Sequence, residues 1–522
     1  MIDPKSLPAS IQEALAAEPL ALQRWDKAIA PHYIGLFLWI VFFDRLAGGT
    51  LVVGGLIASI LAAAVGGVFC FVLLYLPLSL WGESTRRPLP VLAASTFGAR
   101  GSIWIPGFVL GIVNVVWFSV TIRYATELTL RALAAAGLID PARIASWTIG
   151  SIAIESPVFL VTSLLWAIAA ALIGTLALKL IAAVMSVYPV FPALAIGAVA
   201  AISMRGLAFS PYLRMAPSAT SVSSAWLAAT TMIQIVFGYF ATAGTASAEY
   251  GTVARNRRDV FLGGFVGIAI ASCVVATLAL LTVAGDLGQE RRSAFENARA
   301  ERSTSIRLVG EVKSDLIRAD VINNINKPIH RNPVVPSGSN AVDRESLRYV
   351  TIVERSIGGP WACLILVVLA TACLGPSSYT SARFSRHFHD ALPFLKKWRC
   401  ALIGALIAWP ATVIASDWDL TRTFTFTGAL AAPIVAAVSA DAIASRFREP
   451  IIQSNWNLRG MIAWAIGAIV GLVPFGAEFG LLPVKFASSF RPASVYAFIA
   501  SFIIYSLLNI RGFVSGSRSD AR

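Results

Sequence analysis

The chain has 522 residues, of which 57% are hydrophobic and only 13% are charged, with 42 Lys and Arg against 28 Asp and Glu. Soluble proteins carry about 25% charged residues, so this chain has too little charge to cover a soluble protein of its size. The composition predicts a membrane protein. In such a protein the net charge of +14 indicates basic cytoplasmic loops and does not indicate nucleic-acid binding.

The segment before the first long apolar run, residues 1–30, is polar and mixed in character. Its stretch LPASIQEALAAEPLALQRWDKA is typical of a short amphipathic helix and lacks the apolar core of a secretory signal peptide. The first long apolar run begins near Tyr33. We therefore expect a cytoplasmic N-terminal segment at 1–30 and membrane spans that direct their own insertion.

Apolar runs of about 20 residues, the length that crosses a bilayer, recur along the rest of the chain. We predict about twelve transmembrane helices, the first seven within 31–285 and the last five within 357–510, followed by a cytoplasmic tail at 511–522. Mainly glycines divide the apolar stretch 33–81, so eleven spans are the alternative. The predicted spans are 33–54, 55–81, 103–133, 156–176, 180–203, 223–248, 260–284, 358–381, 400–416, 424–444, 460–480 and 493–510.

Loops rich in Lys and Arg alternate with loops poor in them, which is the positive-inside pattern of multi-pass membrane proteins. The pattern predicts an even number of spans in the cell (inner) membrane, with both termini cytoplasmic. The short outer loops hold Arg205, Arg214, Arg422, Lys485 and Arg491, whereas the short inner loops and the tail hold Arg86, Arg87, Arg100, Arg255, Arg257, Arg258, Arg383, Arg386, Lys396, Lys397, Arg399, Arg446, Arg448, Arg511, Arg518 and Arg522.

A long polar segment, 286–356, interrupts the apolar pattern. Acids and bases alternate at helical spacing over 288–322, and NKPIHRNPVVPSGSN at 326–340 is typical of a loop. Long loops cross a membrane largely regardless of their charge, so we expect this segment to be extracytoplasmic and partly helical. It is either a solvated helical cap or a region that binds a protein partner or acts as a gate.

Two spans contain sequences that disfavour a continuous helix at membrane depth, DRLAGGT at 44–50 and YFATAGT at 239–245. Non-helical backbone inside a bilayer is tolerated only where it is buried in protein or lines a cavity, and interrupted spans in corresponding positions are typical of inverted-repeat transporters. Glycines also occur in ordinary helix packing, so both interpretations stay open on this pattern alone.

Seven motifs, spread in order over most of the chain, resemble those of the nucleobase:cation symporter-1 family, which includes permeases for cytosine, purines, pyrimidines, hydantoins and allantoin. Val116 and Ser119 replace two glycines of the third motif, and Glu249 stands where Asp is usual. The motifs are GGTL (48–51), STFGARGSIWIP (95–106), VNVVWFSV (113–120), TAGTASAEYGTVARNRRDVFLGGFVG (242–267), SSYTSA (377–382), TGALAAPIVAAVSAD (427–441) and NWNLRGMIAWAIG (455–467).

The resemblance implies an all-α polytopic LeuT-like fold, with two inverted five-helix repeats, broken helices one and six, and two further C-terminal helices. It also implies a cation-coupled symporter that works by alternating access on a nucleobase or related heterocycle such as cytosine. The coupling ion would be Na+ or H+, and no organic cofactor is expected. The partners would be a small-molecule substrate, a coupling cation and the lipid bilayer.

By this resemblance, Trp117 and Phe240 occupy positions that stack on a planar heterocycle, although both could instead be core aromatics. Thr121, one turn after Trp117, either contacts the substrate or packs between helices. Unwound backbone in the first and sixth spans would expose N–H and C=O groups to a ligand. The predicted substrate-binding residues are Gly48, Gly49, Trp117, Thr121, Phe240, Thr242, Gly244, Pro376 and Ser377.

Span eight reads TACLGPSSY at 371–379 and lacks the family's amide, which leaves Thr371 and Ser377 as hydroxyl ligands. A sodium site shared between spans one and eight would use Thr371. Asp44 and Arg45 stand where the family has small or mildly polar residues. An intramembrane carboxylate is costly, so Asp44 is either a proton or cation carrier or one half of an internal ion pair.

Two further groups of polar residues are candidates for a gate or a metal site. Arg123 and Glu127 lie one turn apart in span three and are expected to form a structural ion pair or a gate. His387, His389 and Asp390 share an inner loop, where a metal role would need further ligands.

The leading hypothesis is a secondary transporter. The alternatives are a membrane sensor or assembly subunit that keeps the fold without transport, or a transporter of an unrelated small molecule. An enzyme is disfavoured because the four histidines form no catalytic pattern, and a channel is disfavoured because repeated filter loops are absent from the sequence.

Overall fold

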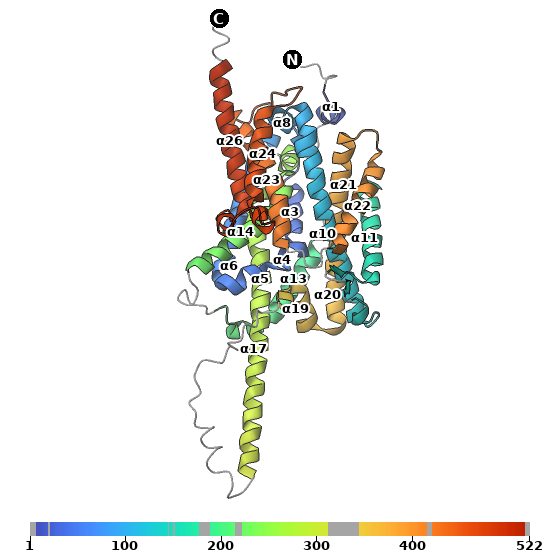
Figure 1. The fold of residues 1–522 in the computed structure, drawn as a ribbon, viewed down its shortest axis with the longest axis vertical. Coiled ribbons are helices and arrows are strands. Elements are labelled where there is room, and N and C mark those ends of the chain that lie inside the picture. The colour runs from blue at the N-terminus through green and yellow to red at the C-terminus, as the bar shows by residue number, and fades with distance from the viewer. Residues whose placement is uncertain are drawn as a thin grey trace.

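A computed structural model of the chain describes residues 7–18, 21–144, 146–149, 152–176, 188–213, 222–311, 344–414 and 420–516. The predicted loop at 326–340, residues 180–187 of the predicted fifth span and the last six residues of the tail lie outside the described residues. Within the described residues the chain is a bundle of helices (Figure 1).

The helices are α1 (Ala9–Ala16), α2 (Trp25–Ala28), α3 (Ala30–Phe37), α4 (Ile40–Phe43), α5 (Leu46–Gly49), α6 (Leu51–Phe69), α7 (Leu76–Thr85), α8 (Leu89–Thr96), α9 (Ala99–Ser102), α10 (Leu110–Ala135), α11 (Pro157–Leu176), α13 (Val190–Ser203), α14 (Val222–Gly244), α15 (Ser247–Val253), α16 (Arg257–Gly264), α17 (Ala271–Glu311), α19 (Tyr349–Ile357), α20 (Gly359–Ala372), α21 (Leu374–Ala391), α22 (Lys397–Ile414), α23 (Leu420–Ala444), α24 (Leu458–Glu478), α25 (Val484–Ser488) and α26 (Ala493–Gly516). Segments of π-helix at Cys70–Tyr75, Ile103–Val109 and Phe265–Ile270 join some of them, and 3-10 turns occur at Pro141–Arg143, Met204–Phe209 and Arg344–Leu347.

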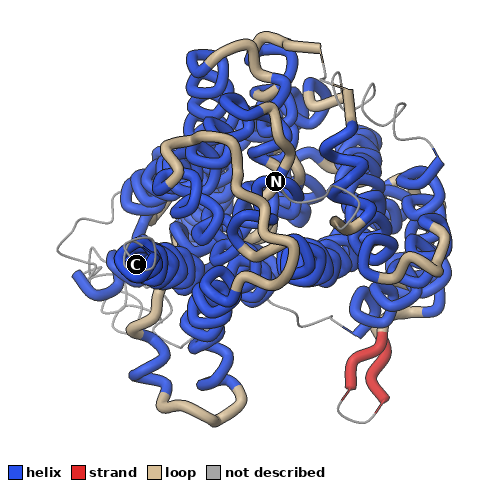
Figure 2. The backbone as a smooth tube through the Cα atoms, turned by 90° about the horizontal axis from the view of Figure 1, so that it is seen from above, coloured by secondary structure: helices blue, strands red, loops and turns tan. Residues whose placement is uncertain are grey.

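The predicted fold class is confirmed. Among the described residues, nine helices are long and apolar enough to cross a membrane, and the bent pair Trp25–Phe37 and Ile40–Gly49 makes a tenth. Helix α22 and the shorter apolar helix α26 lie at the two remaining predicted spans. The strands in the described part of the chain, β1 (Trp147–Ile149) and β2 (Ile152–Ile154), form a small antiparallel hairpin at the rim of the bundle (Figure 2).

The outer surface of the bundle is apolar in a way that suits lipid. On α6, large apolar side chains at helical spacing are exposed, and Ile57 and Leu61 have 66% and 62% of their surface uncovered. A continuous stripe of this kind would be unfavourable in water. The stripe therefore marks a face of α6 that contacts lipid.

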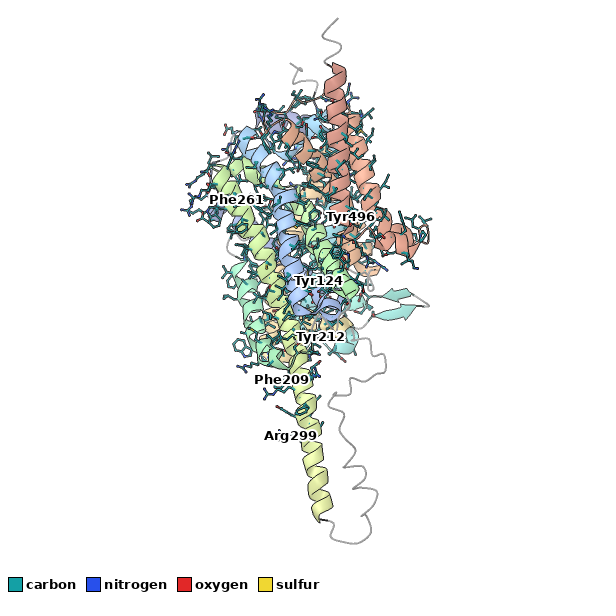
Figure 3. All side chains as sticks on the ribbon, turned by 90° about the vertical axis from the view of Figure 1, so that its left-hand side faces the viewer. Tyr124, Phe209, Tyr212, Phe261, Arg299 and Tyr496 are labelled. Carbon is teal, nitrogen blue, oxygen red and sulfur yellow. The ribbon has the colours of Figure 1, made fainter. Side chains whose placement is uncertain are left out.

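The two ends of the bundle differ. Helix α1 and the C-terminal end of α26 lie at one end, which we name the terminal end, and α17 extends beyond the opposite end, which we name the α17 end (Figure 1). With 41 residues, α17 is roughly 60 Å long, and its part around Arg299 stands clear of the bundle (Figure 3). The helix at the start of the polar segment 286–356 is thus an extension of span seven.

Glycines fix α17 in the bundle just before it leaves. A Cβ atom on Gly285 would lie 2.2 Å from the carbonyl oxygen of Ser203, and one on Gly288 would lie 2.0 Å from the carbonyl oxygen of Gly206. Small residues let two helices approach this closely in a membrane. The contact holds α17 against the C-terminal end of α13 and the 3-10 turn that follows it.

The first span is broken at two places. The bend of 50° lies between Phe37 and Ile40, where Trp39 adopts an extended conformation with ψ of 128° and packs on other aromatic rings. The predicted segment 44–50 is also interrupted, because Arg45 and Thr50 leave helical geometry on either side of the short helix α5. Gly48 and Gly49 themselves lie within α5, since glycine permits a break without requiring one.

The sixth span is interrupted at Thr245 and Ala246, between α14 and α15. This position is at the end of the predicted segment 239–245.

The helices pack in two main groups. The first contains α3, α6, α14 and α17, which belong to spans one, two, six and seven, and we name it the bundle group. The second contains α10, α11, α20, α21 and α22, which belong to spans three, four, eight and nine, and we name it the scaffold group. Helices α23, α24 and α26 pack together, and α23 also contacts α14.

Candidate functional site

A cavity of about 350 Å³ lies between the two groups, next to the break in span one. We name it the central cavity. Its lining residues recur at helical spacing on each element, so that one face of each helix meets the cavity. They are His32, Tyr33, Gly35, Leu36 and Trp39 from span one, Asn114 and Trp117 from α10, Tyr239, Thr242, Ala243, Ala246 and Tyr250 from span six, and Gly375, Pro376, Tyr379, Thr380 and Arg383 from α21.

Trp117 is held by rings and by one hydrogen bond. Its ring stacks on Phe424 with centroids 5.7 Å apart and an interplanar angle of 25°, and the edge-to-face contact with Tyr239 has centroids 5.3 Å apart. Its indole N–H donates to the hydroxyl of Thr242 at 3.0 Å. Because Trp117 lies in the scaffold group and Thr242 in the bundle group, this bond joins the two groups inside the cavity.

A second cavity of about 360 Å³ adjoins the central one. We name it the inner cavity. It shares His32, Tyr250 and Arg383 with the central cavity and is also lined by Gln23 and Val253. Since α3, α4 and α5 follow one another away from the terminal end (Figure 1), Gln23 lies on the terminal side of the central cavity. The central cavity is therefore continuous with a space that leads toward the terminal end.

An ion pair stands where the two cavities meet. Nη1 of Arg383 on α21 lies 3.7 Å from Oε1 of Glu249 on α15, and the guanidinium lies over the ring of Tyr379. The second carboxylate oxygen of Glu249 is buried and has no hydrogen-bond partner among the described residues. The pair links the scaffold group to the bundle group at the terminal side of the cavity.

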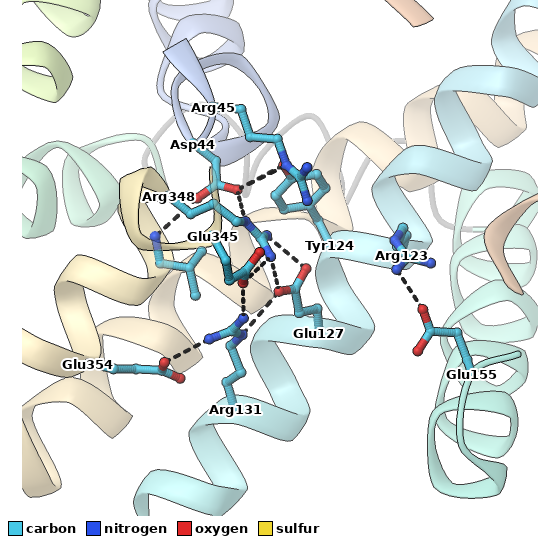
Figure 4. Close-up of polar contacts among 11 residues, drawn as sticks. Asp44, Arg45, Arg123, Tyr124, Glu127, Arg131, Glu155, Glu345, Arg348 and Glu354 are labelled. Carbon is cyan, nitrogen blue, oxygen red and sulfur yellow. Dashed lines mark hydrogen bonds and ion pairs between the residues drawn. The ribbon is translucent and has the colours of Figure 1, made fainter. Parts of the chain in front are cut away.

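A buried charge network joins residues next to α5 and α19 with residues of α10 (Figure 4), and α5 and α19 lie on the side of the bundle from which α17 extends (Figure 1). Asp44 is fully buried and accepts hydrogen bonds from Nε of Arg348 at 2.8 Å, from the hydroxyl of Tyr124 at 2.9 Å, and from the backbone N–H of Val350 at 3.0 Å. Arg45 is farther away, with Nε 4.0 Å from the carboxylate. Asp44 is thus one half of an internal ion pair.

The network continues along α10. The guanidinium of Arg348 also donates to both oxygens of Glu127, at 2.5 and 2.9 Å. Arg131 donates to Glu127 at 3.0 Å and to Glu345 and Glu354 at 2.7 Å each. Burial raises the pKa of Glu354 above its ordinary value, and the charge of Arg131 opposes that rise.

These residues border a third space of about 740 Å³, the vestibule, which shares no lining residue with the central cavity. On α10, Tyr124 lies seven residues beyond Trp117, which is about 10 Å along the helix. The central cavity is therefore separated from the vestibule by the rings around Trp117 and by the network around Asp44.

Of the predicted substrate-binding residues, Trp117, Thr242 and Pro376 line the central cavity. Phe240 does not: it is fully buried and stacks on Phe37 with centroids 5.9 Å apart. The hydroxyl of Thr121 donates to the carbonyl of Trp117.

The other predicted residues also lie outside the cavity lining. The hydroxyl of Ser377 donates to the carbonyl of Cys373, and Gly244 packs against Leu74. Gly48 and Gly49 are exposed residues of α5. Thr371, the predicted ion ligand, lies on an exposed part of α20, and its hydroxyl forms a hydrogen bond with the hydroxyl of Tyr188.

One expected pairing is wrong. Arg123 pairs with Glu155 at 2.6 Å, while Glu127 pairs with Arg348 and Arg131. A carboxylate from another element lies closer to each arginine than the neighbour one turn away. The described residues contain no group of three His, Cys, Asp or Glu side chains that could hold a metal ion, so His387, His389 and Asp390 gain no further ligand among them.

Sequence reasoning missed several lining residues, among them Asn114, Trp39, Tyr239, Tyr250 and Arg383. Asn114 lies three residues before Trp117 and supplies the amide that span eight lacks. The signal that could have found it is helical periodicity, because residues three and four apart share a helix face.

The sequence matches no family model and no curated protein, whereas several solved structures share its fold. Mhp1, a nucleobase-cation-symport-1 family transporter in a closed conformation with bromovinylhydantoin bound, gives a TM-score of 0.59 at 14% identity over 99% of this chain and 96% of that one. Mhp1 in its inward-facing conformation gives 0.57 at 13% identity, over 97% and 95%.

A Na+-coupled sialic acid symporter in a substrate-bound outward-open state gives a TM-score of 0.52 at 13% identity, over 93% of this chain and 90% of that one. The chain thus has the LeuT-like fold of these transporters over nearly its full length. The fold that the sequence motifs implied is confirmed.

Proposed function

We propose that this protein is a cation-coupled secondary transporter that moves a nucleobase or related small planar heterocycle by alternating access. The observation that carries the proposal is the central cavity, which is lined by aromatic rings, lies at the break in span one and leads toward one end of the molecule only. Aromatic faces and a few polar groups are what a planar heterocycle needs for binding. The solved relatives in fold are symporters, which supports the same function.

Alternating access requires contacts that break at one end while others form at the opposite end. Here Asp44 and Arg348 join the two helix groups at the α17 end, while the Arg383–Glu249 pair is longer and adjoins an open space. We take this arrangement as the state that faces the terminal end. Movement of the bundle group against the scaffold group would separate Arg348 from Glu127 and close the inner cavity.

The terminal end is proposed to be cytoplasmic and the membrane to be the cell (inner) membrane. The chain there carries many basic residues, such as Arg255 before α16 and Arg257 and Arg258 in its first turn, which suits the positive-inside pattern. The polar extension of α17 would then be extracytoplasmic.

The coupling cation is proposed to be Na+ or H+. Asp44 and Thr371 stay predicted participants, and the two choices differ in an observable way. Na+ coupling requires uptake to rise with an imposed sodium gradient at constant pH, whereas H+ coupling requires uptake to follow a pH gradient without sodium.

The test is uptake of radiolabelled cytosine, uracil, hydantoin, orotate and nicotinate into proteoliposomes that hold the purified full chain, under sodium, proton and no gradient. We expect one of these compounds to accumulate above its external concentration under one gradient. Liposomes with the Trp117→Ala variant are the control, since they lack the ring that forms the cavity wall. Binding without accumulation under any gradient would contradict transport and favour a sensor or assembly subunit.

A further inference from the structure

The central cavity is lined by basic side chains and by no acidic carboxylate among the described residues. Arg383 and His32 line it, and no Asp or Glu is among the described residues that line it. Glu249, the carboxylate partner of Arg383, borders the inner cavity instead. A ligand in the central cavity therefore meets a cationic group and no anionic one.

Arg383 has donor groups to spare. A guanidinium carries five N–H donors, and the one ion pair of Arg383 in the described part of the chain is the 3.7 Å contact with Glu249, which is longer than a hydrogen bond. The side chain is 21% exposed, and it lines both cavities. A second anion can bind it without displacing a tight partner.

Three hydroxyl groups of the cavity can donate to a ligand as well as accept from it. The hydroxyl of Thr242 accepts from Trp117 and keeps its own proton to donate. Tyr250 and Tyr379 also line the cavity, and their hydroxyls make no hydrogen bond to another described residue. Tyr239 and Thr380 are different, because their hydroxyls already donate to backbone carbonyls.

Asn114 adds a group that can only accept. Its amide nitrogen donates to the carbonyl of Leu110 at 2.6 Å, which leaves the amide oxygen available at the cavity wall. An amide oxygen on α10 and a guanidinium on α21 suit a ring that carries an N–H group and an anionic group.

We infer that the substrate is a small planar ring that carries a carboxylate or another anionic group, and that Arg383 binds this group. The inference rests on the proposed function and narrows its substrate class from neutral bases to heterocyclic or aromatic acids. A carboxylate binds a guanidinium through charge-assisted hydrogen bonds, which are about twice as strong as neutral ones. An organic cation would lie beside Arg383 with no carboxylate in the cavity wall to balance it.

Binding of an anion would also weaken the ion pair between Arg383 and Glu249. The carboxylate of the substrate and that of Glu249 would share one guanidinium, which weakens the link between α21 and α15. The substrate thus changes a contact between the scaffold and bundle groups, and a neutral ring of the same shape does not.

The experiment uses two pairs of probes that differ only in the anionic group: uracil against orotate, and nicotinamide against nicotinate. Their Kd values are measured by titration calorimetry on the purified full chain, on Arg383→Gln and on Arg386→Gln. Arg386 is the matched control because it lies on the same helix, is exposed and does not line the central cavity. Thermal unfolding without ligand shows that each variant is folded.

We expect at least one acid to bind about tenfold or more tightly than its neutral partner. Arg383→Gln should remove that preference, and Arg386→Gln should keep it. Equal affinities within both pairs, failure of both acids to bind, or an unchanged preference in Arg383→Gln would overturn the inference. If the inference fails and uracil is still taken up under a gradient, the proposed transport function stands. If an acid binds but is not taken up, transport is overturned and the anion site stands.

Discussion

Asp44 and Arg348 lie 304 residues apart in the sequence and form a buried ion pair at 2.8 Å. Asp44 belongs to the first span, and Arg348 lies near the end of the polar segment 286–356 and leads into α19. Since Arg348 also binds Glu127 on α10, one guanidinium joins the bundle group to the scaffold group. This pair closes the molecule between the central cavity and the vestibule.

Arg348→Gln should destabilise the protein by about 3–5 kcal/mol, because it leaves the buried carboxylates of Asp44 and Glu127 without their main cation. The measurement is thermal or denaturant unfolding of the purified variant in detergent. Arg45→Gln is the matched control, since Arg45 neighbours the same carboxylate at 4.0 Å from a partly exposed position. Its effect should stay below about 1 kcal/mol. Equal losses in the two variants would contradict the central role of Arg348.

The sequence could not predict this pair. Arg348 lies within the long polar segment 286–356, and no periodicity relates it to Asp44, whereas Arg45 is the adjacent residue in the sequence. Adjacent residues of a helix point in different directions, and Arg45 accordingly lies at the edge of the network. The spans were predictable because lipid imposes a run of apolar residues on each of them. The pairing of two distant charges depends on the tertiary fold.

The hydrogen bond between Trp117 and Thr242 should contribute to ligand binding by holding the indole ring in place. We expect Trp117→Phe and Thr242→Val each to weaken binding of the acid that passes the test above by about 1 kcal/mol. The double variant should lose little more than either single variant, because both remove the same bond. Titration calorimetry on the four proteins measures this. Fully additive losses would show that the bond has no role in binding.

Phe240 should contribute to stability and not to ligand binding, in contrast to Trp117. Phe240→Ala should lower the free energy of unfolding by about 3–5 kcal/mol, because the ring is fully buried against Phe37. The Kd of the folded protein for its ligand should change by less than about threefold, since Phe240 does not line the central cavity. The comparison is with Trp117→Ala, for which we expect binding to be lost. A large loss of affinity in Phe240→Ala at preserved stability would return this residue to the site.

The motif in span six located the correct turn of helix but not the correct face. Tyr239 lines the cavity, whereas Phe240, its neighbour, faces α3. Successive residues of a helix are about 100° apart, so an error of one position moves a side chain from the cavity to the core. Thr242, three residues after Tyr239, lies on the same face as Tyr239 and lines the cavity, and its role in substrate binding stays a prediction.

The close contact at the base of α17 gives the last prediction. Gly285→Ala should destabilise the protein by about 1–3 kcal/mol, because the new Cβ would lie 2.2 Å from the backbone carbonyl of Ser203, which cannot move without shifting α13. The control is Gly197→Ala on α13, where a Cβ would meet no atom within 4 Å. Alanine favours a helix more than glycine does, so this variant should be neutral or slightly more stable. The measurement is the midpoint of thermal unfolding for the two variants side by side. A Gly285→Ala variant as stable as Gly197→Ala would mean that α17 is not held by this contact, and that its extension beyond the bundle is supported by other residues.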